Sequence, residues 1–183
     1  MIKRLLCAVS LLALAGPALA IQDLVISTPS ATFTRPTDTN AYTIGDLVAN
    51  NTSAASVTPL SWAIVALQRD GAYIRSVQLK KSTTGVTAPN FRLHLFTTSP
   101  TVTNGDNGAY ASTSVGWFCD LDVNMYTTDP FSDGNAGIGV PNNGSECAVL
   151  PTVQTIYGLL EARGAYAPGN AEVFTAILEV YEP

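Results

Sequence analysis

Residues 173–180 read VFTAILEV, with an apolar side chain at every second position. The recurring side chains are Phe174, Ala176, Leu178 and Val180. Successive side chains of a β-strand point to opposite faces, so this period of two predicts a strand with one face in a core. Residues 91–96, FRLHLF, repeat the alternation and place Phe91, Leu93 and Leu95 on one face.

Three further stretches have the character of strands, and turn sequences separate them. They are Leu60–Leu67, whose unbroken apolar run is typical of a buried strand, Ala72–Leu79 and Thr152–Leu160. Asp70-Gly71, Asn104-Gly105 and Asn143-Gly144 are dipeptides that favour turns. Together these signals predict an all-β fold, an antiparallel, jelly-roll-like β-sandwich. We expect the polar stretches 97–114 and 129–145 to be surface loops, where binding residues concentrate.

Composition limits the classes of function. The chain has 183 residues, of which 46% are hydrophobic and 13% charged, and its formal net charge is −5. This apolar content is too high for a disordered chain, and the length suits a single β-sandwich domain over residues 21–183. An acidic chain lacks the basic surface that meets phosphates, so we expect no nucleic-acid partner.

Residues 1–20, MIKRLLCAVSLLALAGPALA, have the three parts of a secretory signal peptide. Lys3 and Arg4 are followed by an apolar run, and Ala18-Leu19-Ala20 resembles a cleavage site. The run is short for a membrane span. We expect cleavage after Ala20, export to the periplasm or the medium, and no stable membrane span afterwards. An uncleaved anchor and an apolar tail packed into a partner are the alternatives.

Export would leave Cys119 and Cys147 as an even pair. A pair of cysteines in an exported chain predicts a disulfide, and two buried free thiols are the alternative. His94 is the only histidine, so these residues are too few for a transition-metal site.

The sequence offers little that could perform catalysis. His94 lies in the middle of a predicted strand, which is more typical of a surface or interface residue than of a catalytic base. Asp120 and Asp122 would share a face on a strand, as the carboxylates of a glycosidase must, but solvated carboxylates explain them equally well. Asp106, Asp129 and Asp133 lie in oxygen-rich loops but not at the spacing of a calcium-binding hand. We therefore expect no enzymatic activity, no cofactor and no metal.

A cluster of aromatic residues is a better candidate for a binding surface. It comprises Tyr110, Trp117, Phe118, Tyr126 and Phe131. Exposed aromatic side chains make good anchors for a partner. The alternative is that they pack their loop onto the sandwich.

Four blocks of the sequence are distinctive in their order and spacing. Residues 41–48 read AYTIGDLV, and residues 73–79 read YIRSVQL. LHLF at 93–96 is followed by Ser99-Pro100 and Asp106-Asn107, and residues 156–166 read IYGLLEARGAY. In that order, these blocks resemble the AYxxGDVV opening, the xIRSVxL strand, the LHLFxxxPxxxxxxDNxA block and the LYxxLxxRGAY block of a family of small proteins encoded by tailed bacteriophages and prophages. Order and spacing agree from residue 41 to about residue 180.

The resemblance implies a β-rich virion component, a capsid decoration or a tail-associated protein. Such a protein would act through contacts with capsid or tail proteins, as a homo-oligomer and without catalysis. Two features depart from the family: the signal-like N-terminus and the divergent stretch 115–146. An exported β-sandwich that binds a surface glycan or protein is therefore the alternative function.

Arg75 and Arg163 are charged residues inside apolar strand blocks of this resemblance. A charge in such surroundings usually pairs with a carboxylate or with carbonyl groups. We expect both to form structural ion pairs, or otherwise contacts between subunits.

Overall fold

The computed structural model describes residues 25–64, 71–83, 90–126 and 134–182. The signal-like segment 1–20 lies outside these ranges, as do Phe131, Asp129 and Asp133. The described residues form strands and one short 3-10 helix, η1 (Ala54–Ser56). The strands are β1 (Val25–Ser27), β2 (Ser30–Thr34), β3 (Leu47–Val48), β4 (Leu60–Ala63), β5 (Ala72–Lys81), β6 (Asn90–Phe96), β7 (Trp117–Met125), β8 (Asn135–Pro141), β9 (Cys147–Val149), β10 (Thr155–Ala162) and β11 (Val173–Glu182).

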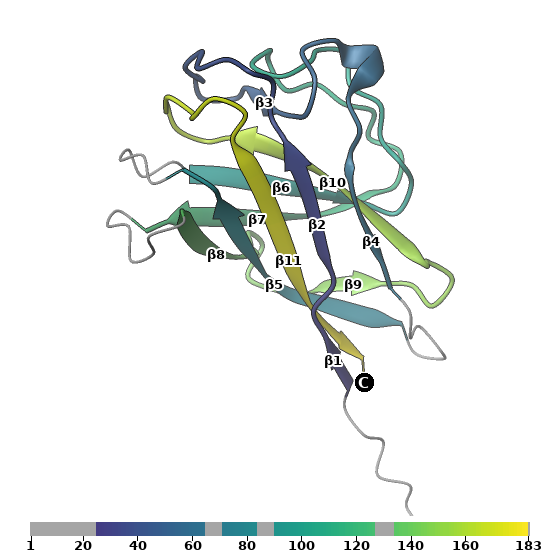
Figure 1. Ribbon diagram of the computed structural model, residues 1–183. Helices are drawn as coiled ribbons and strands as arrows, with labels where there is room; N and C mark the ends of the chain where they lie inside the picture. Colours follow the sequence, from purple (N-terminus) through teal and green to yellow (C-terminus); the bar gives the residue numbers. More distant parts are fainter. Residues whose placement is uncertain (1–24, 65–70, 84–89, 127–133, 183) are drawn as a thin grey trace, which may run out of the picture.

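The strands pair into one antiparallel sheet in the order β1-β11-β5-β8-β7-β6-β10-β3. β2 also pairs with β11, β4 with β10, and β9 with β5. The sheet folds over on itself, so that β2 and β11 cross in front of β6 and β10 (Figure 1). The predicted all-β antiparallel fold is confirmed, and the two layers of this sandwich are halves of one continuous sheet. Within the described ranges, no helix has the length and apolar character needed to cross a membrane.

The main core lies between these two halves. The alternation predicted for the last strand is confirmed, because Phe174, Ala176, Leu178 and Val180 are all fully buried. The ring of Phe174 meets that of Phe91 on β6 edge to face, with the centroids 5.5 Å apart. The two predicted core faces therefore pack against each other.

A second, smaller core lies on the other side of β6 and β10. It is formed by Leu47, Ala49, Phe96 and Leu159, with Val102 and Tyr110 packed against it. Val102 and Tyr110 belong to the long connection between β6 and β7. This connection is therefore held against the sheet by a core of its own.

Three predictions about local structure were wrong. The stretch 129–145 is not a loop throughout, because Asn135–Pro141 forms β8. Trp117 and Phe118 lie not in a loop but at the start of β7. In the predicted buried strand Leu60–Leu67, Ser61 and Ala63 are exposed while Leu60 and Trp62 are buried, so β4 is not buried on both faces. Residues 65–67 of that prediction lie outside the described ranges. β4 pairs with β10, and the face that carries Ser61 and Ala63 is open to solvent.

The predicted disulfide is confirmed. Cys119 on β7 and Cys147 on β9 are both buried and bonded, with their Cα atoms 5.8 Å apart. This separation is within the usual range for a disulfide. The bond joins β7 to the short strand β9, which pairs with the first residues of β5.

Candidate functional site

β7 has one face in the core and one face outward. Cys119, Leu121, Val123 and Met125 point into the core, and Asp120, Asp122 and Asn124 alternate with them. Asp120 lies opposite His94 of β6, and Asp122 opposite Arg92. On the other side, Asp122 lies opposite Val140 of β8. We call this surface of β6, β7 and β8 the outer face.

His94 is clamped between two carboxylates on the outer face. Its Nδ1 is 2.8 Å from Asp120 Oδ1 on β7, and its Nε2 is 2.9 Å from Glu161 Oε2 on β10. The side chain of His94 is only 10% exposed. It stacks on the ring of Tyr110, with the centroids 4.2 Å apart and 16° between the planes. His94 therefore ties three strands and the β6–β7 connection together.

Both carboxylates have a second donor. Trp117 Nε1 donates a hydrogen bond to Asp120 Oδ1 at 2.8 Å. Arg163 donates to Glu161 Oε1 at 3.0 Å. One oxygen of Asp120 thus holds both the imidazole and the indole.

The electrostatics favour a charged His94. Burial works to lower the pKa of His94, but the hydrogen bonds to Asp120 and Glu161 outweigh it and raise the pKa above its ordinary value. Burial likewise works to raise the pKa of both carboxyls. The hydrogen bonds from His94, with those from Trp117 and Arg163, outweigh it and lower the pKa of Asp120 and that of Glu161.

Arg92 and Asp122 form a bidentate ion pair beside this cluster. Arg92 Nε donates to Asp122 Oδ1 at 2.6 Å, and one of its terminal nitrogens donates to Oδ2 at 2.8 Å. The two carboxylates considered for a glycosidase, Asp120 and Asp122, do share a face. Each is already paired with a cation, so the arrangement binds neighbouring strands together.

Large apolar side chains stand around these ion pairs. Trp117 is 52% exposed, and on β8 Ile138 and Val140 are 55% and 58% exposed. The inward positions of β8 next to Ile138 and Val140 are Gly137 and Gly139. A Cβ at Gly137 would lie 2.4 Å from the carbonyl oxygen of Asn124, and one at Gly139 would lie 2.5 Å from the Val123 side chain. β8 therefore turns glycine inward and its branched apolar side chains outward.

The predicted aromatic cluster is divided by the structure. Trp117 and Tyr126 are exposed, and Tyr126 follows the last residue of β7. Phe118 packs against the main core, and Tyr110 packs in the smaller core. Phe131 lies outside the described residues. Trp117 and Tyr126 remain available to a partner, while Phe118 and Tyr110 hold the fold.

The two predicted ion-pair arginines both have acidic partners. Arg75 is 3.9 Å from Glu179 and its side chain is 60% exposed, so this pair is a loose surface contact. Arg163 pairs with Glu161 at 3.0 Å and so belongs to the His94 cluster.

Asp106, which was considered as a calcium ligand, is buried and fully bonded. It accepts hydrogen bonds from Arg35, the Tyr42 hydroxyl and the backbone N–H of Ala49. Its oxygens therefore face the protein. Among the described residues no group of three or more histidine, cysteine or acidic side chains is placed to hold a metal ion.

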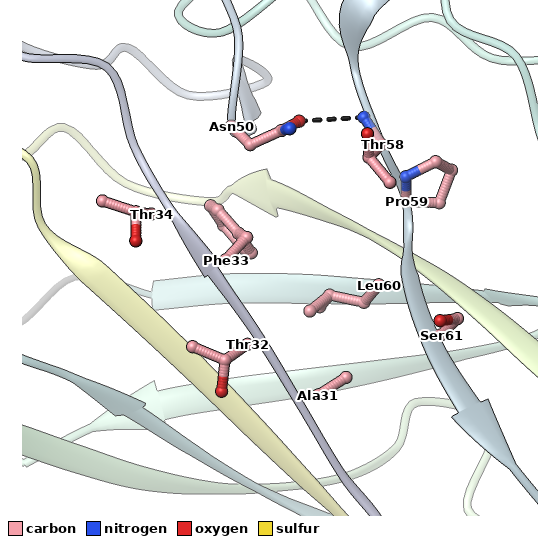
Figure 2. A pocket seen from close by; sticks show the side chains of 9 residues that line it. All are labelled: Ala31, Thr32, Phe33, Thr34, Asn50, Thr58, Pro59, Leu60 and Ser61. Atoms are coloured by element: carbon pink, nitrogen blue, oxygen red, sulfur yellow. Dashed lines mark hydrogen bonds between the residues drawn. The ribbon is translucent and has the colours of Figure 1, made fainter.

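A groove of about 490 Å³ lies between β2 and β4. Figure 2 shows Phe33 and Leu60 in the space between the two strands, with Asn50 and Thr58 at one end. Asn50 Oδ1 accepts a hydrogen bond from Thr58 N at 2.8 Å at one end. The residues that line the groove carry no charged side chain.

Several residues of the outer face were not anticipated. Ile138 and Val140 point outward because the inward positions beside them are glycines. The strand therefore lacks the usual alternation of inward apolar and outward polar side chains. The pairing of His94 with Glu161 joins residues far apart in the sequence. The alternation of Cys119, Leu121, Val123 and Met125 was a readable signal for β7, but the register with β6, which places Asp120 beside His94, is set by the pairing of the sheet.

A comparison with protein-family models finds no match for this sequence, and a search of curated proteins also finds none.

Proposed function

We propose that this protein is a structural component of a bacteriophage virion, a capsid decoration or a tail-associated protein. It acts without catalysis, through contacts with other virion proteins, and as a homo-oligomer. The outer face of β6, β7 and β8 is its docking surface. The observation that carries this proposal is the outward placement of Trp117, Ile138 and Val140 on paired strands.

Large apolar side chains on a rigid, paired strand favour a protein partner. Exposed aromatic and branched residues supply contact area, and strands lose little entropy when a partner orders them. The surrounding ion pairs, Arg92–Asp122 among them, would form the polar rim that such interfaces usually have.

The positions of the family-like blocks also separate residues that support the fold from residues that would dock on a partner. Tyr42, Asp106 and Tyr166 come from three different blocks and meet in one buried cluster. They support the fold. The stretch 115–146, which departs from the family, instead supplies Trp117, Ile138 and Val140. A common scaffold with a divergent surface suits related virion proteins that dock on different partners.

The test is incorporation into particles. Trp117→Ala and Val140→Ser should leave the fold intact but reduce the amount of protein in gradient-purified particles. Truncating a central aromatic anchor costs about 2 kcal/mol or more, which lowers affinity roughly thirtyfold. Leu150→Ser is the matched control, because Leu150 is 71% exposed but lies after β9. Full incorporation of both outer-face variants would contradict the proposed docking surface.

The groove between β2 and β4 favours a second candidate, an exported module that binds a neutral glycan. Uncharged hydroxyl and amide groups beside an apolar floor suit a sugar chain better than an ionic ligand. Titration with neutral oligosaccharides would support it if Ser61→Val and Asn50→Ala weaken binding. A glycan that binds equally well to both variants would exclude the groove as its site.

A further inference from the structure

The outer face contains a histidine whose two ring nitrogens both face carboxylates. A protonated imidazole donates through both nitrogens, whereas a neutral one donates through one and presents a lone pair at the other. At 2.8 Å and 2.9 Å from Asp120 and Glu161, only the protonated form satisfies both contacts. The geometry of the clamp therefore depends on the charge of His94.

The groups around His94 balance its positive charge. β7 contributes Asp120 and Asp122, β10 contributes Glu161, and β6 contributes Arg92, while Arg163 directly follows β10. Three acids thus face two arginines and the imidazole. Tyr110, stacked on the ring, stays neutral because burial raises its pKa to about 12. Loss of the proton from His94 leaves an unbalanced negative charge in a nearly buried cluster.

The clamp is connected to the exposed indole. Asp120 Oδ1 accepts hydrogen bonds from His94 Nδ1 and from Trp117 Nε1. A neutral His94 donates a hydrogen bond to only one of the two carboxylates, and the lone pair on its other nitrogen repels the second carboxylate. This repulsion displaces the cluster to which the indole is bonded. Trp117 is thus held through Asp120 by an imidazole whose hydrogen bonds to Asp120 and Glu161 raise its pKa above the ordinary value.

We propose that His94 is the positioning residue for Trp117, and that it holds the indole in its docking orientation only while the imidazole is protonated. This inference rests on the proposed function for its consequence, which is that the protein leaves its partner as the pH rises. The link between His94 and Trp117 is a property of the isolated chain and can be tested without any partner.

Tryptophan fluorescence gives a direct readout, because the chain contains only two tryptophans. Trp62 is buried, and its Nε1 donates to the carbonyl oxygen of Ala176 at 3.0 Å. Subtracting the emission of Trp117→Phe from that of the full-length wild type isolates the signal of Trp117. This signal, and its quenching by acrylamide, should be followed from roughly pH 5 to pH 9.

We expect one transition in the Trp117 signal, with a midpoint above the ordinary histidine value of 6.5. His94→Gln should remove the transition while leaving the Trp62 emission unchanged, which shows that the variant is folded. Arg75→Gln is the matched control and should keep the transition. A signal of Trp117 that is flat across this range, or a transition that persists in His94→Gln, would overturn the inference.

The consequence for docking needs a separate measurement. Purified particles held at pH values on either side of the transition should lose wild-type protein on the alkaline side and show no such step with His94→Gln. If the Trp117 emission changes with pH but Trp117→Ala is fully incorporated into particles, the proposed docking surface is wrong. The link between His94 and Trp117 is then still supported. If incorporation into particles depends on Trp117 but the Trp117 emission does not change with pH, His94 does not position the indole. The proposed docking surface is then still supported.

Discussion

The rings of Tyr42 and Tyr166 stack in the buried interior, with their centroids 5.1 Å apart and 11° between the planes. Their hydroxyls donate to two different carboxylates, Tyr42 to Asp106 at 2.6 Å and Tyr166 to Glu172 at 3.0 Å. Each carboxylate also pairs with a buried cation. Asp106 pairs with Arg35 at 2.8 Å, and Glu172 pairs with Lys81 at 3.3 Å.

Asp106→Ala should destabilise the protein strongly, because it removes the closer and fully buried acidic partner of the Arg35 guanidinium and leaves the longer pair with Asp38, at 3.4 Å. Breaking one side of a buried pair costs about 3–5 kcal/mol. Urea denaturation followed by circular dichroism measures the change. Arg75→Gln removes a mostly exposed ion pair and should change the free energy of unfolding by less than about 1 kcal/mol. Equal effects of the two variants would show that the Asp106 cluster is not a stabilising element.

Gly158 on β10 lies directly under the indole of Trp62. A Cβ at this position would lie 2.7 Å from two ring carbons of Trp62 and 3.0 Å from Leu93. Gly158→Ala should therefore overpack the core and cost about 1–3 kcal/mol. Gly164→Ala is the control, since its added Cβ meets nothing nearer than 4.0 Å. A thermal midpoint for Gly158→Ala as high as that of the control would contradict this packing.

The bond between Cys119 and Cys147 closes a loop over a sequence separation of 28. In the chain-entropy model, losing such a crosslink costs roughly 3–4 kcal/mol. The double variant Cys119→Ser, Cys147→Ser should lower the thermal midpoint, and reduction of the wild type should lower it in the same way. Reduction should have no further effect on the double variant. A wild type indifferent to reductant would mean that the disulfide does not stabilise the fold.

The His94 cluster should make the free energy of unfolding depend on pH in two ranges, one alkaline and one acidic. The raised pKa of His94 means that its contribution is complete below the ordinary value of 6.5 and is lost as the pH rises through the folded-state pKa. The lowered pKa values of Asp120 and Glu161 mean that their contribution is present above the ordinary values of 3.8 and 4.5 and is lost at lower pH.

Urea midpoints measured across the pH range should therefore be highest between these limits. His94→Gln should reduce the loss of stability that the cluster causes as the pH rises. An unchanged loss of stability at alkaline pH in that variant would assign this pH dependence to other groups.

Ile138→Thr and Val140→Thr should leave stability nearly unchanged, because both side chains point outward from paired strand positions. Exposed substitutions usually change the free energy of unfolding by less than about 0.5 kcal/mol. Denaturation midpoints measure this directly. A loss of several kcal/mol would mean that these side chains already support the fold and are not held ready for a partner.

The sequence was sufficient for the fold class, because alternation in stretches such as 173–180 depends only on the local period of strands. The disulfide was also predictable from an even count of cysteines behind a signal-like segment. The same reasoning did not find β8, where inward glycines reverse the usual pattern. It also placed Trp117 in a loop, although the alternation of residues 119–125 carried the signal of a strand.

The arrangement of the candidate site could not be predicted from local patterns. His94, Asp120 and Glu161 lie on three strands whose register depends on how the sheet pairs. The Arg35–Asp106 pair likewise joins the start of the domain to the β6–β7 connection. Such contacts follow from tertiary packing, which single-sequence periodicity does not encode.

The central claim is most directly tested by locating the native protein. Intact mass and N-terminal sequence should be determined for the protein from gradient-purified phage particles, from the periplasm and from the culture medium. A virion role predicts a stoichiometric amount of the protein in particles. A chain that begins at Ile21, occurs in the periplasm or medium and is absent from particles would contradict the virion role.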